Sequence, residues 1–249
     1  MEIALGLLIG VAIGATGVGG GTLTAPALVL LLGYPPKVAV ATALIFAAVV
    51  KIWASGEYLV RKQVDFRVLA WLLCGGLPGA LVGAVALERF KIARANQWIL
   101  SGIGAVVLIS AVTSVFNIRK GLRRGGPKLH LLPFFTIPIG IESGFSSSGT
   151  GALGTVLLFR FTSLNSTTVV GTDLLFGMLV CGIAGAVHAA AGACDWRALA
   201  QLVPAGIIGT MVGVRLGSAL PTKTLRKSVL LCAAAIGLSL LVRGMGGIL

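Results

Sequence analysis

Long uninterrupted apolar segments constrain this chain more than any other feature of its sequence. They lie at 38–59, 66–87, 96–117, 167–192, 198–219 and 227–248. A helix of about 20 apolar residues crosses the hydrocarbon core of a bilayer, which is about 30 Å thick. Only 11% of the residues are charged, whereas soluble domains carry about 25%. The sequence therefore predicts an all-α, multi-pass membrane protein without a separate soluble domain.

Shorter apolar segments occur in two pairs. The first pair is 2–15 and 22–33, and the second is 131–144 and 152–161. A helix of about 12 to 14 residues reaches only about 20 Å, so each of these segments enters the membrane without crossing it. A glycine-rich stretch interrupts the first pair, and a serine-rich stretch interrupts the second. We predict a broken or re-entrant helix pair in each half, followed by three membrane-spanning helices.

The two halves of the chain repeat one another. A shift of 130 residues, without gaps, aligns glycines and polar residues of the first half with those of the second. The aligned pairs include Gly10 with Gly140, Gly14 with Gly144, Thr42 with Thr172, Asp65 with Asp195 and Arg67 with Arg197. The sequence predicts two tandem membrane repeats, at 1–118 and 131–249, joined by a basic cytoplasmic linker at 119–130.

The distribution of Lys and Arg favours an inverted second repeat. If each short pair is a re-entrant hairpin, each half crosses the membrane three times, and the loops at 61–67 and 223–227 share one face with the linker. If each pair is one broken span, the 223–227 loop lies on the opposite face. Cytoplasmic loops are rich in Lys and Arg, and the first arrangement gathers most of these charges together. We therefore attribute the net charge of +13 to cytoplasmic loops and expect no nucleic-acid partner.

The two interruptions form the predicted substrate site. Non-helical backbone is tolerated inside a membrane only against protein or a water-filled cavity, and repeat-built transporters bind their substrates at paired broken helices. Because a helix N-terminus presents free N–H groups and a positive dipole end, the half-helices that start here favour an anion. Thr22 is the expected N-cap of the first, and Ser147 and Ser148 add hydroxyl donors in the second. Close helix packing is the alternative explanation for the glycines.

Lys51 stands inside the apolar 38–59 segment. An ionisable residue within a membrane segment is a functional candidate by default. In one interpretation, the Lys51 ammonium neutralises the bound anion. In the other, the side chain snorkels toward Trp53 and the membrane interface. The sequence leaves both interpretations open.

Other ionisable residues in or near apolar segments are candidates for proton coupling. They are Asp173, Glu142 and His188. Asp65 and Asp195 have a different interpretation, because each stands at a short junction just before a predicted helix. An acid in that position caps the free N–H groups of the first turn, so we predict that both are N-caps.

Several short motifs resemble the TauE/SafE family of sulfite and sulfonate exporters. They are the glycine-rich 17–22 stretch with 24–28 after it, 39–44, and 170–174 in the second half. The resemblance implies secondary transport of a small sulfur oxyanion or organosulfonate across the bacterial inner membrane, without ATP hydrolysis. It also implies substrate-binding residues at Gly19, Gly20, Gly21, Thr22, Thr42, Gly149, Thr150, Gly151 and Thr172. The 146–148 serine run departs from the family, which often has a second glycine run there.

Other functional classes fit the sequence less well. The histidines, His130 and His188, belong to no HExxH or GxSxG motif, so we expect no enzymatic activity. The glycine run lacks the preceding strand and the Lys of a nucleotide site, and the cysteines lack metal-binding spacing, so we expect neither a cofactor nor a metal. The alternative functions are an anion channel and, after it, an intramembrane enzyme. The expected partners are a small anion and the lipid bilayer, and a homo-oligomer is left open.

Overall fold

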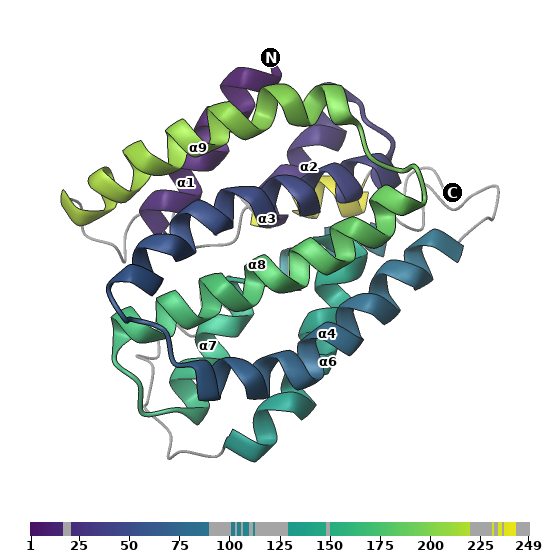
Figure 1. Ribbon diagram of the computed structural model, residues 1–249. Helices are drawn as coiled ribbons and strands as arrows, with labels where there is room; N and C mark the ends of the chain where they lie inside the picture. The colour runs from purple at the N-terminus through teal and green to yellow at the C-terminus, as the bar shows by residue number, and fades with distance from the viewer. Residues whose placement is uncertain are drawn as a thin grey trace.

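The computed structural model describes most of both halves. The described residues are 1–16, 21–89, 101–102, 104–105, 107–109, 112, 129–147, 150–219, 231, 234–235 and 237–242. Within them the chain forms helices and no strands (Figure 1). The helices are α1 (Glu2–Thr16), α2 (Gly21–Leu32), α3 (Pro36–Val60), α4 (Phe66–Arg89), η1 (Leu129–Leu131), α6 (Leu132–Ser146), α7 (Ala152–Phe161), α8 (Ser166–Ala190) and α9 (Trp196–Ala219). Most of the expected linker at 119–130 lies outside the described residues.

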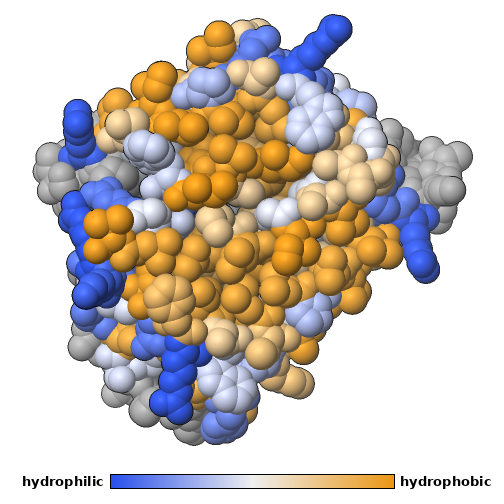
Figure 2. Space-filling model, in the orientation of Figure 1, coloured by the Kyte–Doolittle hydropathy of each residue, from blue (hydrophilic) through white to orange (hydrophobic). Residues whose placement is uncertain are grey.

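The molecule presents a surface suited to lipid. Three of the helices, α3, α4 and α8, are long and apolar enough to cross a membrane. In Figure 2 a broad apolar surface covers the middle of the molecule, and hydrophilic side chains gather toward its left and right ends. Among the described residues the prediction of an all-helical chain is confirmed, and the three long apolar helices are consistent with a membrane protein.

The helices of the two halves begin and end at matching positions in the sequence. α6, α8 and α9 each begin and end 130 residues after α1, α3 and α4, respectively. Figure 1 places α1 beside α9 on one side of the α3–α8 pair, and α4 beside α6 on the other. Each half therefore packs a helix of its short pair against a long helix of the other half.

Glycines allow these helix pairs to approach one another closely. A Cβ added to Gly10 would overlap the carbonyl oxygen of Gly206, and a Cβ added to Gly140 would overlap that of Gly76. These two contacts are the same contact with the halves exchanged, because each residue is replaced by its counterpart 130 positions away. Small residues that permit such close approach are the usual means of packing membrane helices.

The contacts also give the directions of the helices. Along α3 and α8, Ile45 lies against Gly185, Lys51 against Cys181 and Ser55 against Met178, so the two helices run antiparallel. In contrast, α1 runs parallel to α9, because Gly6 faces Leu202 and Gly10 faces Gly206. The equivalent contacts of Gly75 with Pro133 and of Gly79 with Ile137 show that α4 and α6 are also parallel.

The helices that follow the short loops at 61–65 and 191–195 are capped as predicted. Asp65 Oδ1 accepts a hydrogen bond of 3.0 Å from the Val68 N–H, and Asp195 Oδ1 accepts one of 3.0 Å from the Ala198 N–H. Each carboxylate therefore satisfies a free donor at the start of a helix. Asp195 also accepts from the Arg197 N–H at 2.9 Å. The N-cap predictions for both aspartates are confirmed.

The segments predicted to be the last span of each half, 96–117 and 227–248, are described only in part. Their described residues pack against one another: a Cβ on Gly237 would lie 3.1 Å from the Gly104 carbonyl oxygen. Val107 in the first segment and Leu240 in the second are fully buried. This contact brings the ends of the two halves together.

Candidate functional site

The Lys51 side chain points into the protein at the crossing of α3 and α8. It is 1% exposed. Its ammonium Nζ donates a hydrogen bond of 3.0 Å to Thr150 Oγ1, and it lies 3.8 Å from Cys181 Sγ. The snorkelling alternative is therefore wrong, because the chain does not extend along the helix surface toward the interface. Lys51 and Thr150, two of the predicted site residues, contact one another.

Among the described residues, no side chain of opposite charge forms an ion pair with Lys51. Within the part of the chain that the structure describes, the ion pairs join Lys37 to Glu88, Arg61 to Glu57 and His188 to Glu88, and none of them involves Lys51. Taking an ammonium out of water costs several kcal/mol, and a partner of opposite charge offsets this cost. A hydroxyl and a thiol are neutral, so the site can accept an anion.

The second break begins where α6 ends. Ser147 has φ of 64°, in the left-handed region, and its N–H donates to the Ser143 carbonyl oxygen at 2.8 Å. Gly151, with φ of 108°, precedes α7. A side chain at that φ is strained, so glycine suits the position. Ser147 and Thr150 are each 1% exposed, while the other predicted site residues of this break, Ser148 and Gly149, lie outside the described residues.

The first break is described at its edges. α1 ends at Thr16 and α2 begins at Gly21, and Gly19 and Gly20 between them lie outside the described residues. Thr22 falls in the first turn of α2 rather than before it, so the expected N-cap position is wrong by at least one residue. Thr22 is buried, as expected for a residue beside an internal site.

Thr42 and Thr172 anchor loops of the opposite half. Thr42 Oγ1 accepts a hydrogen bond of 3.2 Å from the Asp195 N–H, and Thr172 Oγ1 accepts one of 3.0 Å from the Asp65 N–H. Thr42 is nine residues from Lys51 on the same helix, which is about 13 Å along the axis. The structure therefore does not bring these two predicted site residues to the Lys51 ammonium.

Two of the proton-coupling candidates lie near the second short pair. Asp173 is 3% exposed, and its Oδ2 accepts a hydrogen bond of 2.7 Å from Thr155 Oγ1 in the first turn of α7. A Cβ added to Gly154 would overlap Asp173 Oδ1, so this carboxylate packs directly on the start of α7. Glu142 lies in α6, and its backbone carbonyl accepts a hydrogen bond of 3.0 Å from Ser146 Oγ.

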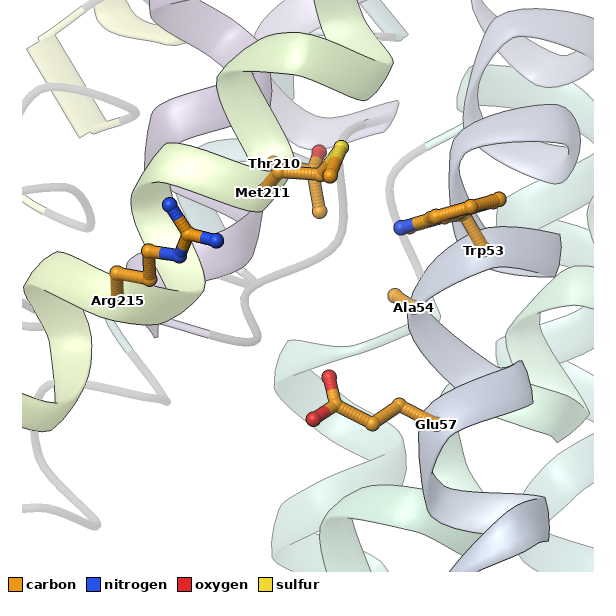
Figure 3. A pocket seen from close by; sticks show the side chains of 6 residues that line it. All are labelled: Trp53, Ala54, Glu57, Thr210, Met211 and Arg215. Atoms are coloured by element: carbon orange, nitrogen blue, oxygen red, sulfur yellow. The ribbon is translucent and has the colours of Figure 1, made fainter.

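A pocket opens between α3 and α9. It has a volume of about 200 Å³ and is lined by Trp53, Ala54, Glu57, Thr210, Met211 and Arg215. Figure 3 shows Glu57 and Arg215 reaching from opposite walls, with Trp53 above them. Ala54 stands one helical turn after Lys51 on α3. The pocket therefore lies about one turn along α3 from the buried ammonium.

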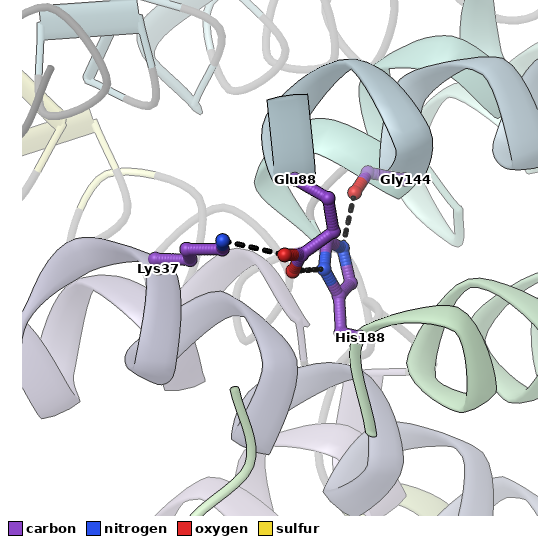
Figure 4. A network of polar contacts seen from close by, with 4 residues as sticks. All are labelled: Lys37, Glu88, Gly144 and His188. Carbon is purple, nitrogen blue, oxygen red and sulfur yellow. Dashed lines mark hydrogen bonds and ion pairs between the residues drawn. The ribbon is translucent and has the colours of Figure 1, made fainter. Parts of the chain in front are cut away.

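The third candidate, His188, belongs to a polar network of four helices (Figure 4). Its Nδ1 lies 2.7 Å from Glu88 Oε1, and its Nε2 lies 3.1 Å from the Gly144 carbonyl oxygen. The other Glu88 oxygen forms an ion pair with Lys37 Nζ. His188 is fully buried. Glu88 and Lys37 stand at segment ends and have the pattern of interfacial charges, so nothing in the sequence alone marks them as functional.

In the described part of the chain, no group of three His, Cys, Asp or Glu side chains could hold a metal ion. The free cysteines there are Cys74, Cys181 and Cys194. The polar groups gathered at Lys51 are instead hydrogen-bond donors of the kind that suits an oxyanion.

Comparison with known proteins identifies the family. The family model for Sulfite exporter TauE/SafE matches residues 2–240. The chain is 28% identical over 225 residues to the Probable membrane transporter protein YjnA of Bacillus subtilis (strain 168), with 86% of this chain and 88% of that protein covered. It is 24% identical over 270 residues to the Probable membrane transporter protein YunE of the same organism, with 98% and 97% covered. No solved structure matches. Because the family model covers nearly the whole chain, this multi-pass membrane protein belongs to the TauE/SafE family of membrane transporters.

Proposed function

We propose that the protein is a secondary transporter that moves a small anion across the bacterial inner membrane. The observation that carries this proposal is the Lys51 ammonium, which is 1% exposed and hydrogen-bonded to Thr150 in the second break. A negative partner stabilises a buried ammonium that has no carboxylate in contact. A transported anion that binds there provides that partner.

The substrate class that we propose is a sulfur oxyanion or an organosulfonate. The description of the matching family names sulfite. An ammonium carries three donors, and hydroxyls and free helix N–H groups add further neutral ones. Such a set suits an anion that presents several oxygens to different sides. We keep Lys51 and the predicted residues of the two breaks as the substrate site, without Thr42 and Thr172, which hold distant loops: Gly19, Gly20, Gly21, Thr22, Lys51, Ser147, Ser148, Gly149, Thr150 and Gly151.

We also propose that the two halves are inverted repeats, each with a re-entrant pair and three spans. The antiparallel course of α3 and α8 supports the inversion, because these helices occupy equivalent positions in the two halves. The parallel course of α4 and α6 supports the hairpin. α6 then starts at the face where α4 starts, and α7 leads to α8, which starts at that same face.

We name the two membrane faces by α3: it begins at the proximal face and ends at the distal face. In the proposed arrangement, the loop at 61–67, the linker and the loop at 223–227 all lie at the distal face. Because these segments carry most of the Lys and Arg in the loops, the positive-inside rule makes the distal face cytoplasmic. The domain limits of 1–118, 119–130 and 131–249 follow this division.

Binding and flux measurements test the proposed function. The purified chain is screened by thermal shift against sulfite, thiosulfate, sulfate, sulfoacetate and taurine, with acetate as the carboxylate control. The best ligand is then followed into proteoliposomes. Saturable exchange of internal for external anion supports a transporter, whereas ohmic, non-saturating current supports the anion channel. Absence of binding to every sulfur compound would overturn the proposed substrate class.

A further inference from the structure

The contact between His188 and Glu88 defines a protonation state. The Gly144 carbonyl oxygen can only accept a hydrogen bond, so His188 Nε2, 3.1 Å away, carries the hydrogen of that contact. On the other side of the ring, Nδ1 and Glu88 Oε1 are 2.7 Å apart. A neutral imidazole that already carries its hydrogen on Nε2 has only a lone pair at Nδ1. Two lone pairs at this distance would repel, so a proton lies between Nδ1 and Oε1.

The pair therefore holds one proton more than a neutral imidazole beside an ionised carboxylate. Lys37, on the other carboxylate oxygen, stabilises the arrangement of imidazolium, carboxylate and ammonium. Among the described charged and titratable side chains, Lys37 from α3 and His188 from α8 contact Glu88. α6 contributes the Gly144 carbonyl through the imidazole, and Arg89 follows Glu88 on α4.

The position of this network connects it to the anion site. Lys37 opens α3, while Glu88 and His188 lie near the ends of α4 and α8, so the network stands at the proximal face. Gly144 precedes the end of α6 by two residues, directly before the second break. Lys37 is 33% exposed and His188 is fully buried. The network therefore runs from the proximal surface to α6, the helix that leads into the second break.

We propose that the Glu88–His188 pair binds the proton that couples transport, and that the bound proton closes the anion site toward the proximal face. This inference rests on the proposed function and names its coupling ion. When the proton leaves, the neutral imidazole keeps one hydrogen and can donate it to Glu88 or to the Gly144 carbonyl oxygen but not to both, so α8 loses its contact with either α4 or α6. The site can then open at the proximal face. The proton returns to the same two atoms when the face closes.

The counterparts of these residues in the other half do not form a second proton site. The counterparts of Lys37, Glu88 and His188, 130 residues away, are Thr167, Ser218 and Tyr58. None of these side chains changes its charge near neutral pH, because Ser and Thr hydroxyls do not ionise and a phenol does so near pH 10. A proton therefore controls the proximal face alone.

Transport in proteoliposomes tests the coupling. The full chain is reconstituted, and radiolabelled thiosulfate and isethionate serve as probes, because both stay ionised throughout the assay. With the membrane potential held at zero by valinomycin and equal potassium on both sides, a pH difference of one unit should drive accumulation of the probe toward about tenfold, the ratio equivalent to one proton per anion. Glu88→Gln and His188→Gln should reduce this ratio to one while leaving probe binding and anion exchange in place. Glu2→Gln, which removes a carboxylate that accepts a hydrogen bond from the Tyr34 hydroxyl, should respond like the wild type.

The outcomes separate the two proposals. If the wild-type protein exchanges anion regardless of the pH difference, the proposed coupling is overturned and the proposed function stands. The same conclusion follows if both variants accumulate the probe to the level of the wild type. If the wild type binds no anion, the proposed function fails and the proton site is decided by nitrogen NMR of the imidazole in a His130→Gln background. A proton on Nε2 and a second proton shared at Nδ1 are expected. A neutral ring protonated only at Nδ1 would overturn the site. Lys37→Met provides a further variant if either substitution prevents folding.

Discussion

The side chains of Lys51 and Cys181 meet at the crossing of α3 and α8, with Nζ 3.8 Å from Sγ. These residues are 130 positions apart, which is also the offset between the starts of α3 and α8. In the proposed inverted arrangement, a residue and its counterpart touch only near the axis that relates the two halves. The chain therefore places one ammonium at this central point and a neutral thiol where a symmetric sequence would have a second ammonium.

Removing the Lys51 charge should weaken anion binding. Lys51→Met is expected to raise the dissociation constant at least about tenfold, because a charge interaction at about 4–6 Å exceeds 1.4 kcal/mol at an effective dielectric constant near 20. Lys51→Arg should retain part of the affinity, since the charge persists while the donor geometry changes. Calorimetric titration of the best-binding sulfur anion measures both constants. Equal constants for the wild type and Lys51→Met would remove Lys51 from the site.

A methyl group at Gly177 should displace the same ammonium. A Cβ there would overlap Lys51 Nζ and lie 3.2 Å from Thr150 Oγ1. We expect Gly177→Ala to weaken anion binding several-fold. Gly182→Ala on the same helix is the matched control, because its Cβ would meet only the Ala48 methyl at 4.0 Å. The control should bind normally and gain up to about 1 kcal/mol of stability from helix propensity; equal affinities for the two variants would contradict the site.

Close packing of α1 on α9 predicts a stability effect. Gly10→Ala places a Cβ into the backbone of Gly206, and overpacking of this kind costs about 1–3 kcal/mol. Gly56→Ala is the control, because nothing lies within 4 Å of its added Cβ. The measurement is the thermal midpoint in detergent, which should fall for Gly10→Ala and stay or rise for Gly56→Ala. A normal midpoint for Gly10→Ala would argue against this helix contact.

The inverted arrangement predicts which loops share a membrane face. Single cysteines replace Gln63, Lys223 and Ala191 in a chain whose native cysteines are removed. A membrane-impermeant thiol reagent applied to whole cells should label the Ala191 position, while positions 63 and 223 should react only after the membrane is opened. Labelling of positions 63 and 223 on opposite faces would contradict the inverted repeat.

The cap at Asp195 predicts a pH-dependent contribution to stability. Hydrogen bonds from the Ala198 N–H, then from Tyr34 and the Arg197 N–H, lower the pKa of this carboxyl group below its usual value. A lowered folded-state pKa stabilises the folded protein above the usual pKa of about 4, and this stabilisation disappears as the pH falls through the folded-state value. Asp195→Ala should therefore cost about 1 kcal/mol at neutral pH and less in acid. Asp195→Asn, which keeps an acceptor oxygen, should cost little at either pH; thermal midpoints across pH provide the comparison.

Local pattern in the sequence determined the elements of the fold. The lengths of the apolar segments predicted the helices, and the 130-residue offset anticipated helix limits that coincide between the halves. The capping roles of Asp65 and Asp195 were also readable, because a cap depends on residues only three positions away. Lys51 and Thr150 could be selected singly as candidates, since an ionisable residue or a break in an apolar segment is visible without knowledge of its neighbours.

Only the tertiary structure decided what these residues touch. The inward course of Lys51 depends on Thr150 and Cys181, which lie 99 and 130 residues away in the chain. Thr42 shares a helix with Lys51 but contacts a distant loop, and Glu88 meets His188 across 100 residues. The pattern of apolar residues along one helix indicates which of its positions are buried, because that pattern depends on the helix itself. The partner of a buried polar group depends on which helices pack together and in what register, and the sequence does not display that choice locally.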